Sequence, residues 1–220
     1  MSLIISSLYN FFFRILSFIE KHETMIIIGE TGCGKTTQIP QFIYEERLNG
    51  EKAIGITQPR RVAASTLAAR VSQEMDCELG KTVGFCVRFE DVTSLQTKIK
   101  FLTDGMLLRE SIFDEMLSNY SFIILDEAHE RTVHTDVLFG IVKLAQRLRK
   151  FKNLPSLKVI VMSATMDVDH FSSYFGKAPV AYVEGRQYTV DVLHAVNPQE
   201  DYIFSCLVTV FQIHQDAPPK

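Results

Sequence analysis

The fold is decided by the stretch Met25-Ile-Ile-Ile-Gly-Glu-Thr-Gly-Cys-Gly-Lys35-Thr36, in which an apolar run leads directly into a glycine-rich loop. The run at residues 25–28 predicts a buried β-strand, and the residues after the loop predict a helix. Residues 29–36 match the pattern GxxxxGK[ST]. Glycines let such a loop curl so that backbone N–H groups and the positive end of the next helix face one anion. The stretch therefore predicts a strand, loop and helix that bind a nucleoside triphosphate.

Further apolar runs at residues 53–56, 122–125 and 159–162 predict more strands. Continuous apolar runs are typical of strands that are covered on both faces, as in parallel sheets. Apolar residues recur at helical spacing at 62–75 and 136–148, which predicts the helices that connect the parallel strands. The fold class is therefore α/β, a parallel sheet flanked by helices. A further strand at 188–195 and a helix at 201–214 are expected to begin a second lobe.

The composition is that of a globular protein: 46% of the 220 residues are hydrophobic, 22% are charged, and the net charge is −3. This balance excludes a disordered tail, a collagen-like fibre and a coiled coil, and it gives no general attraction to polyanions. The basic stretch 143–158 is interpreted as the solvated C-terminal end of a helix and a loop. The four cysteines have neither zinc-site spacing nor the density of a disulfide-rich domain, so reduced thiols are expected.

The apolar segment at residues 3–19 leaves three interpretations open. It is interrupted by Asn10 and Arg14 and is shorter than the roughly 20 apolar residues of a membrane span. A helix that packs on the domain is the favoured interpretation. An interfacial helix and a targeting segment are the alternatives.

An acidic pair, Asp126 and Glu127, directly follows the apolar run at 122–125. Parallel α/β sheets bind ligands at the carboxyl ends of their strands. Asp126 is therefore expected to hold Mg²⁺, and Glu127 is expected to orient and deprotonate the water that attacks the γ-phosphate. Without the glycine-rich loop, such a pair would more often be a helix cap.

Residues 126–129 spell Asp-Glu-Ala-His, and the chain resembles the DEAH-box branch of the superfamily 2 RNA helicases. The resemblance runs from about residue 25 to the end of the chain, and the segments 134–140 and 210–215 are most similar to a metazoan nucleolar member. The other matching segments are Gly-Glu-Thr-Gly-Cys-Gly-Lys-Thr-Thr at 29–37, Thr-Gln-Pro-Arg-Arg-Val-Ala-Ala at 57–64, Thr-Asp-Gly-Met-Leu-Leu-Arg-Glu at 103–110, Glu-Arg-Thr at 130–132, Ser-Ala-Thr at 163–165 and Gly-Arg-Gln-Tyr at 185–188.

The resemblance implies a set of site residues for Mg·ATP. Catalytic roles fall on Lys35, Asp126 and Glu127, and on His129, Ser163 and Thr165, which would couple the γ-phosphate to lobe movement. The magnesium ligands would be Thr36, Asp126 and Glu127. The nucleotide-binding residues would be Gly29, Glu30, Thr31, Gly32, Cys33, Gly34, Lys35, Thr36, Thr37 and Arg70, the last by stacking on the base.

The resemblance also implies contacts with RNA by Arg60, Arg61, Thr103 and Gly105. Contacts to phosphates position a strand without reading its bases, so little sequence preference is expected. The expected partners are single-stranded RNA, or a duplex with a single-stranded tail, and a protein activator. No stable membrane association is expected. Family analogy places the protein in the nucleus, including the nucleolus, or in the cytoplasm.

Three parts are expected: an apolar helical extension at 1–24, a RecA-like P-loop NTPase lobe at 25–181, and the start of a truncated second RecA-like lobe at 182–220. The family's later motifs include an arginine that reaches the γ-phosphate, and they are missing. We therefore expect an ATP-dependent RNA helicase whose unwinding is impaired in this chain, which binds nucleotide without appreciable turnover. The alternatives are a non-catalytic nucleotide- or RNA-binding module or isoform and, less favoured, a DNA translocase.

Overall fold

The computed structural model describes residues 15, 18–19, 21–164, 168–183, 192–195, 197–198 and 200–216. The chain divides into two compact units, Met1–Arg186 and Gln187–Lys220. Within the described residues, no helix has both the length and the apolar character needed to cross a membrane.

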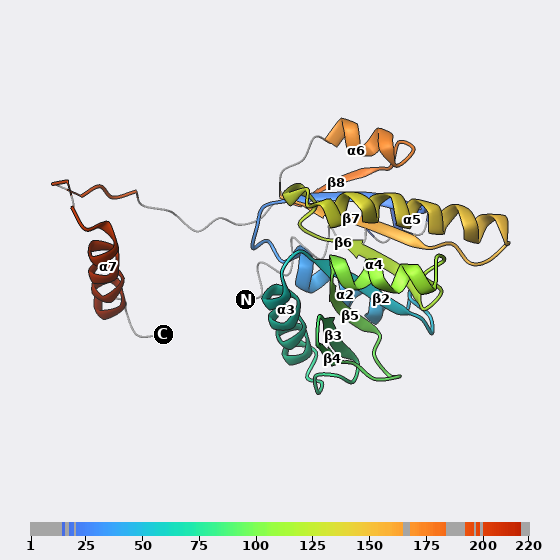
Figure 1. Cartoon of the computed structure of the whole chain (residues 1–220), viewed down its shortest axis with the longest axis horizontal. Helices are drawn as coiled ribbons and strands as arrows, with labels where there is room; N and C mark the ends of the chain where they lie inside the picture. Colours follow the sequence, from blue (N-terminus) through green and yellow to red (C-terminus); the bar gives the residue numbers. More distant parts are fainter. Residues whose placement is uncertain are drawn as a thin grey trace. The chain divides into compact units, whose positions relative to one another are not determined.

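The first unit contains an eight-stranded sheet in the order β4-β3-β5-β2-β6-β7-β1-β8 (Figure 1). Strand β4 pairs antiparallel with β3, and every other pairing is parallel. The predicted α/β class is confirmed, and so are the four predicted strands of this unit. The strands are β1 (Thr24–Gly29), β2 (Ala53–Gln58), β3 (Val83–Val87), β4 (Glu90–Val92), β5 (Ile99–Thr103), β6 (Tyr120–Leu125), β7 (Lys158–Ser163) and β8 (Val180–Val183).

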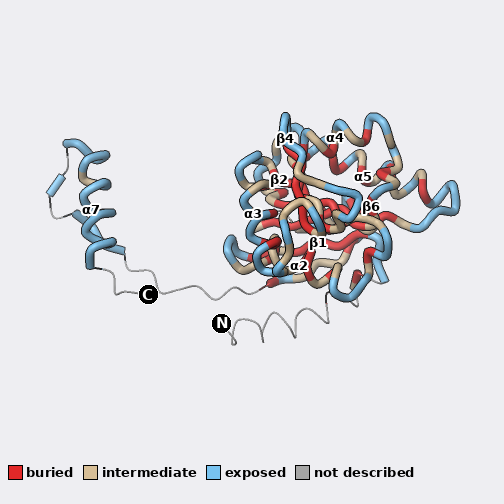
Figure 2. The backbone as a smooth tube through the Cα atoms, turned by 90° about the horizontal axis from the view of Figure 1, so that it is seen from below, coloured by how far each residue is buried: buried red, intermediate tan, exposed pale blue. Residues whose placement is uncertain are grey.

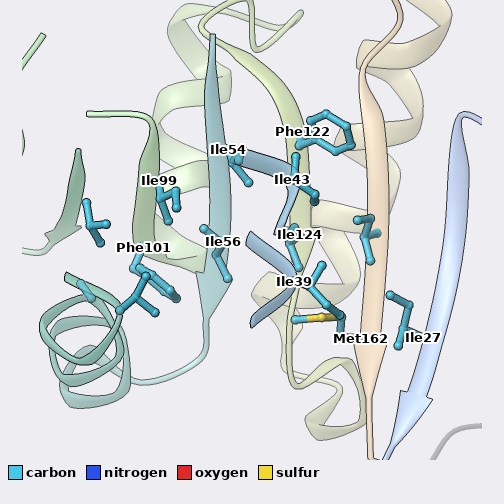
Figure 3. Packing of buried hydrophobic residues seen from close by; sticks show 14 of the residues in the cluster. Ile27, Ile39, Ile43, Ile54, Ile56, Ile99, Phe101, Phe122, Ile124 and Met162 are labelled. Atoms are coloured by element: carbon cyan, nitrogen blue, oxygen red, sulfur yellow. The ribbon is translucent and has the colours of Figure 1, made fainter. Parts of the chain in front are cut away.

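Helices cover both faces of this sheet, which explains the unbroken apolar runs of its strands. In β6, Phe122 and Ile124 belong to one buried cluster, whereas Ile123 and Leu125 belong to the other. Helices α2 (Lys35–Glu45) and α3 (Arg61–Glu74) pack on the first cluster, which Figure 3 shows from close by. The second cluster is covered by α4 (Asp104–Phe113), α5 (Val133–Phe151) and α6 (Val168–Tyr174).

The buried residues concentrate on the strands in the middle of the first unit, and exposed residues lie on the outer surfaces of the helices (Figure 2). Ile15 and Ile19 are also buried, in the same cluster as α2. The interpretation of residues 3–19 as a helix that packs on the domain remains a prediction. Apart from these two and Phe18, that segment lies outside the described residues.

One expectation about the basic stretch 143–158 is wrong. Arg147, Lys150 and Lys152 are exposed, but Arg149 is only 2% exposed. Its guanidinium donates hydrogen bonds to the backbone oxygens of Met116, Leu117 and Tyr120. The side chain therefore ties α5 to the loop before β6 and is not part of a solvated surface.

The parallel strands have their carboxyl ends on the same side of the sheet; these strands are β1, β2, β5, β6 and β7. This topology brings together the residues at or just after their ends: Gly29, Gln58, Thr103, Asp126 and Ser163.

The second unit contains helix α7 (Tyr202–Asp216), which confirms the predicted helix at 201–214. The strand predicted at 188–195 is not found at residues 192–195, and residues 188–191 lie outside the described part of the chain.

Candidate functional site

The glycine-rich loop connects the end of β1 to α2, which begins at Lys35. Gly32 and Gly34 have φ angles of 83° and 92°, in the left-handed region that glycine adopts without strain. Gly29 is required for another reason, because a Cβ atom there would lie 2.8 Å from the backbone oxygen of Val183 in β8. The loop is thus held against the neighbouring strand, as a tight phosphate-binding turn requires.

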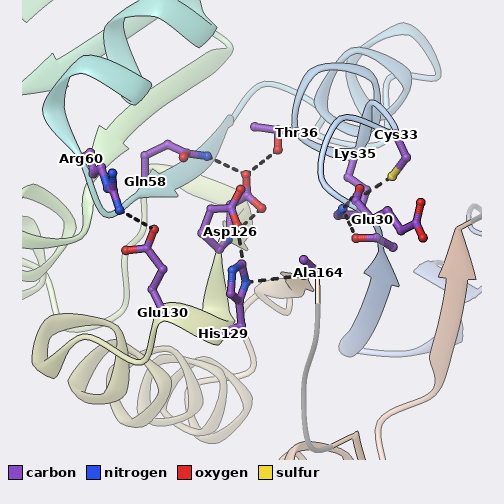
Figure 4. Close-up of polar contacts among 12 residues, drawn as sticks. Glu30, Cys33, Lys35, Thr36, Gln58, Arg60, Asp126, His129, Glu130 and Ala164 are labelled. Carbon is purple, nitrogen blue, oxygen red and sulfur yellow. Dashed lines mark hydrogen bonds and ion pairs between the residues drawn. The ribbon is translucent and has the colours of Figure 1, made fainter. Parts of the chain in front are cut away.

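Lys35 is 7% exposed and folds over its own loop (Figure 4). Its Nζ donates hydrogen bonds to the backbone oxygens of Gly29 and Glu30, the latter over 2.9 Å, and lies 3.5 Å from Cys33 Sγ. Backbone oxygens carry partial negative charge and hold the ammonium at the mouth of the loop. A bound phosphate would compete with these oxygens for the same donor.

Asp126 is the point at which the loop and the acidic pair meet. The Thr36 hydroxyl and the Gln58 side-chain amide each donate a hydrogen bond of 2.6 Å to Asp126 Oδ2. The backbone N–H of Glu127 donates to the other carboxylate oxygen over 2.9 Å. Burial raises the pKa of Asp126 above its usual value, while these three hydrogen bonds favour the charged form and oppose that rise.

Glu127 follows with φ of 50° and ψ of 35°, a left-handed conformation that is uncommon for a residue other than glycine. Burial and the neighbouring Asp126 carboxylate raise the pKa of Glu127. A raised pKa brings a carboxyl group closer to the range in which it can take a proton from water. Strained backbone of this kind occurs often at functional sites.

His129 lies in the short 3₁₀ turn η1 (Ala128–Glu130), between Glu127 and the end of β7. The backbone N–H of Ala164 donates to His129 Nδ1 over 3.5 Å, and the same atom lies 3.5 Å from Glu127 Oε2. The structure thus brings His129 to the segment that begins at the buried Ser163. Thr165 lies outside the described residues.

A pocket of about 640 Å³ lies over the glycine-rich loop. It collects most of the predicted ATP residues, and it includes several that the sequence analysis did not single out. Asp126 is buried below the lining and reaches it through Thr36. The lining residues are Thr31, Gly32, Gly34, Lys35, Thr36, Thr37, Gln58, Pro59, Arg60, Ala63, Thr66, Leu67, Glu127, His129 and Glu130.

Gln58 is the most informative residue that the sequence analysis missed. It is 2% exposed, and its side-chain amide donates its hydrogen bond to Asp126. The signal that could have found it is its place two residues beyond the apolar run 53–56, at the carboxyl end of β2 and close to the carboxyl end of β6, which Asp126 follows.

Arg70, predicted to stack on the base, is not among the residues that line this pocket. It lies on α3, one turn beyond Thr66, and its Nε donates to Glu74 Oε1 over 2.7 Å. Glu74 also accepts hydrogen bonds from Gln38 and Gln41 of α2. The stacking role therefore remains a prediction.

The predicted RNA residues lie where β2 leads into α3 and where β5 leads into α4, at the carboxyl ends of the two strands. Arg60 is exposed and lies 3.4 Å from Glu130, while Arg61 begins α3 with its side chain in solvent. Thr103 precedes α4, and Gly105 is exposed in its first turn. Arg60 also lines the pocket over the glycine-rich loop, whereas Arg61, Thr103 and Gly105 do not.

The donors around Asp126 suit Mg²⁺, which prefers carboxylate, hydroxyl and water oxygens. Asp126 Oδ2 and Thr36 Oγ1 are 2.6 Å apart, so one ion could contact both after a small shift. A buried carboxylate whose pKa is raised by desolvation gains most from a cation placed beside it. The described residues therefore fit the metal that the sequence predicts.

Comparison with known proteins assigns most of the first unit to one family model. The model described as "DEAD/DEAH box helicase" matches residues 14–172. That span contains both the glycine-rich loop and the Asp126–His129 segment.

Curated relatives match nearly the whole chain. "ATP-dependent RNA helicase DHX33" of Mus musculus is 60% identical over 205 residues, which are 93% of this chain and 29% of the relative. The Drosophila melanogaster protein of the same name is 58% identical over 96% of this chain and 30% of its own length. "Pre-mRNA-splicing factor ATP-dependent RNA helicase DEAH10" of Arabidopsis thaliana is 45% identical over 94% of this chain and 34% of its own length.

Proposed function

Because the chain belongs to the DEAD/DEAH box helicase family, we propose that its first unit binds Mg·ATP and single-stranded RNA as the RecA-like lobe of an ATP-dependent RNA helicase. One observation carries this proposal. Thr36 of the glycine-rich loop contacts Asp126 of the acidic segment over 2.6 Å, although the two residues are 90 positions apart in the sequence. A phosphate-binding loop joined to a buried carboxylate is the arrangement that nucleoside-triphosphate chemistry requires.

The proposed roles follow from the positions of the side chains. Backbone N–H groups of the loop and the start of α2 face the phosphates, and Lys35 exchanges its backbone partners for the β- and γ-phosphate oxygens. Thr36 and Asp126 hold Mg²⁺, which when bound neutralises the charge that develops on the phosphate oxygens. Glu127, on the pocket wall, accepts a proton from the attacking water.

His129 and the segment that begins at Ser163 form the proposed link between the pocket and lobe movement. The support is the contact of the Ala164 N–H with His129 Nδ1, over 3.5 Å. A change at the γ-phosphate would reach the end of β7 through Glu127 and this histidine.

The chain spans about 29% of the length of the mouse relative. Separation of nucleic-acid strands by the whole protein is therefore proposed from family membership alone. The geometry described above supports only the proposal of an ATP site. A protein activator and a location in the nucleus, nucleolus or cytoplasm remain predictions.

The proposal is tested by ATP hydrolysis of the purified chain, measured with and without a single-stranded oligoribonucleotide. The expected result is nucleotide binding, and any RNA-stimulated hydrolysis must disappear in Glu127→Gln while binding persists. Glu90→Gln is a matched control, because Glu90 is an exposed acid on β4 at the far edge of the sheet. Hydrolysis that survives in Glu127→Gln would overturn the role of this residue.

A further inference from the structure

Residues 127–132 form a short connection between the ATP site and α5. Within it, Glu127 has a φ of 50° and Arg131 has a φ of 47°, both in the left-handed region. Arg131 is fixed by two hydrogen bonds to Asp136, of 2.6 and 3.0 Å. Thr132 then caps α5, because its hydroxyl accepts the backbone N–H of Thr135 over 3.1 Å. A segment held at both ends transmits a displacement of one end to the other.

Both regions with predicted RNA contacts, the residue before α3 and the start of α4, contact this connection or the start of α5. The first contact is on the surface, where Arg60 Nη2 lies 3.4 Å from Glu130 Oε1. The second is buried, where Asp104, which lies between Thr103 and Gly105, accepts a hydrogen bond of 2.6 Å from the Thr135 hydroxyl. Thr132 completes a chain of hydroxyls, with its Oγ1 2.7 Å from Thr135 Oγ1 and 3.4 Å from Asp104 Oδ2.

Packing alone does not account for Asp104. The residue is 3% exposed, and its Oδ1 atom has no hydrogen-bond partner among the described residues. A buried carboxylate with an unsatisfied oxygen destabilises the fold, and such a group in a native structure calls for an explanation. An acid near the start of α4 interacts favourably with the helix dipole, but that interaction does not require a fully buried side chain.

We infer that Asp104, through Thr132 and Thr135, is a positioning residue that couples RNA bound at Arg60 and at the start of α4 to the conformation of Glu127. The inference rests on the proposed function and assigns to the 127–132 connection the role of transmitting between the two ligands. RNA that displaces α4 moves Asp104, and the hydroxyl chain passes this movement to the start of α5 and back to Glu127. The Arg60–Glu130 pair constrains the same connection from the β2 side.

The test measures coupling between two ligands as a ratio of affinities. A fluorescent, non-hydrolysable ATP analogue with Mg²⁺ is titrated into the 220-residue chain with and without saturating oligouridylate, and the oligouridylate is titrated with and without the analogue. Coupling between sites is reciprocal, so both experiments must give the same factor, of the order of 5- to 150-fold. The key variant is Thr135→Val, which removes the hydroxyl and keeps the volume. Thr135→Ser restores the hydroxyl as the matched control.

We expect Thr135→Val to bring the coupling factor to within about twofold of one while each separate affinity changes little, and Thr135→Ser to keep the factor of the original chain. Glu130→Gln breaks the surface contact without disturbing the core and is expected to lower the factor partly. It keeps the inference testable if Thr135→Val does not fold.

Four outcomes overturn the inference. Coupling that is unchanged in Thr135→Val overturns it, and so does unchanged coupling in Glu130→Gln if Thr135→Val does not fold. An original chain that binds both ligands without coupling overturns it while leaving the proposed function intact. An original chain that binds neither ligand overturns the proposed function and the inference together.

Discussion

At Asp126, burial raises the pKa of the carboxyl group, so the folded chain holds a proton there more strongly than the unfolded chain does. The free energy of unfolding contributed by this group is therefore highest below its unfolded pKa and falls as the pH rises through the raised folded value. At neutral pH without Mg²⁺, we expect Asp126→Asn to be at least as stable as the original chain. Urea unfolding across the pH range measures this difference.

The same experiment separates the effect of Asp126 on the free energy of unfolding from its role in binding Mg·ATP. As the pH falls and the original carboxyl group becomes protonated, the advantage of Asp126→Asn should shrink. Added Mg·ATP should stabilise the original chain and leave Asp126→Asn unaffected, because ligand binding stabilises the form that binds it. A variant that is less stable by the same amount at every pH would contradict this account of the site.

The raised pKa of Glu127 leads us to expect a second pH effect, on the rate of ATP hydrolysis. Its pKa is raised by burial and by the Asp126 carboxylate, from an ordinary value of 4.5. The base must be deprotonated to accept a proton from water, so any RNA-stimulated hydrolysis by the chain should fall on the acid side at a pH above 4.5. A rate profile over the acid and neutral range checks this. A profile that stays flat down to pH 4.5 would contradict the role of Glu127 as the base.

The residues of the site differ in how far the sequence reveals them. Lys35, Thr36, Asp126 and Glu127 are recognisable because each stands in a local pattern, a glycine-rich loop or an acidic pair after an apolar run. Gln58 acts through Asp126, which is 68 positions away, and only the order of the strands brings the two together. Asp104 is hidden in the same way, because its partners lie on α5.

At the scale of elements, Arg149 holds α5 against the loop before β6. Arg149→Met would keep much of the side-chain volume but remove the guanidinium that donates to the backbone oxygens of Met116, Leu117 and Tyr120. Of these, Leu117 O would still accept the backbone N–H of Tyr120 over 2.9 Å. Leaving buried acceptors unsatisfied costs about 1–3 kcal/mol for each group, and partial rehydration offsets some of it. We expect the free energy of unfolding to fall by about 3 kcal/mol, measured by urea denaturation.

Arg147→Met is the matched control, because Arg147 lies on the same helix but is exposed. It should change the free energy of unfolding by less than about 0.5 kcal/mol. Equal effects of the two substitutions would show that Arg149 acts only through helix propensity or general charge.

Some elements are predictable from the sequence and others are not, for physical reasons. Strands β1, β2, β6 and β7 are covered on both faces, so burial leaves apolar runs that predict them. Strand β4 lies at the edge of the sheet and reads Glu-Asp-Val, so it carries no apolar run. The prediction that residues 143–158 are solvated failed at Arg149. The basic composition of the stretch does not show which cation is buried, and the burial of Arg149 depends on the distant backbone oxygens that its guanidinium contacts.

At the scale of the whole molecule, the first unit contains every described strand and both buried clusters. Helix α7 of the second unit contributes no buried residue. We therefore expect residues 1–186 alone to keep the nucleotide affinity and the unfolding midpoint of the 220-residue chain. Calorimetry and nucleotide titration of both chains compare them, and a large loss of either quantity would show that the first unit depends on residues 187–220.

The most direct test of the ATP site is a titration of the chain with a non-hydrolysable ATP analogue, with Mg²⁺ and with a chelator, beside Lys35→Ala and the exposed-lysine control Lys150→Ala. A charged hydrogen bond contributes about 1.5–3 kcal/mol, so Lys35→Ala should weaken Mg²⁺-dependent binding by about tenfold or more. Lys150→Ala should bind like the original chain. Equal affinities in all three chains, or an original chain that binds no nucleotide, would contradict the account of this pocket as an Mg·ATP site.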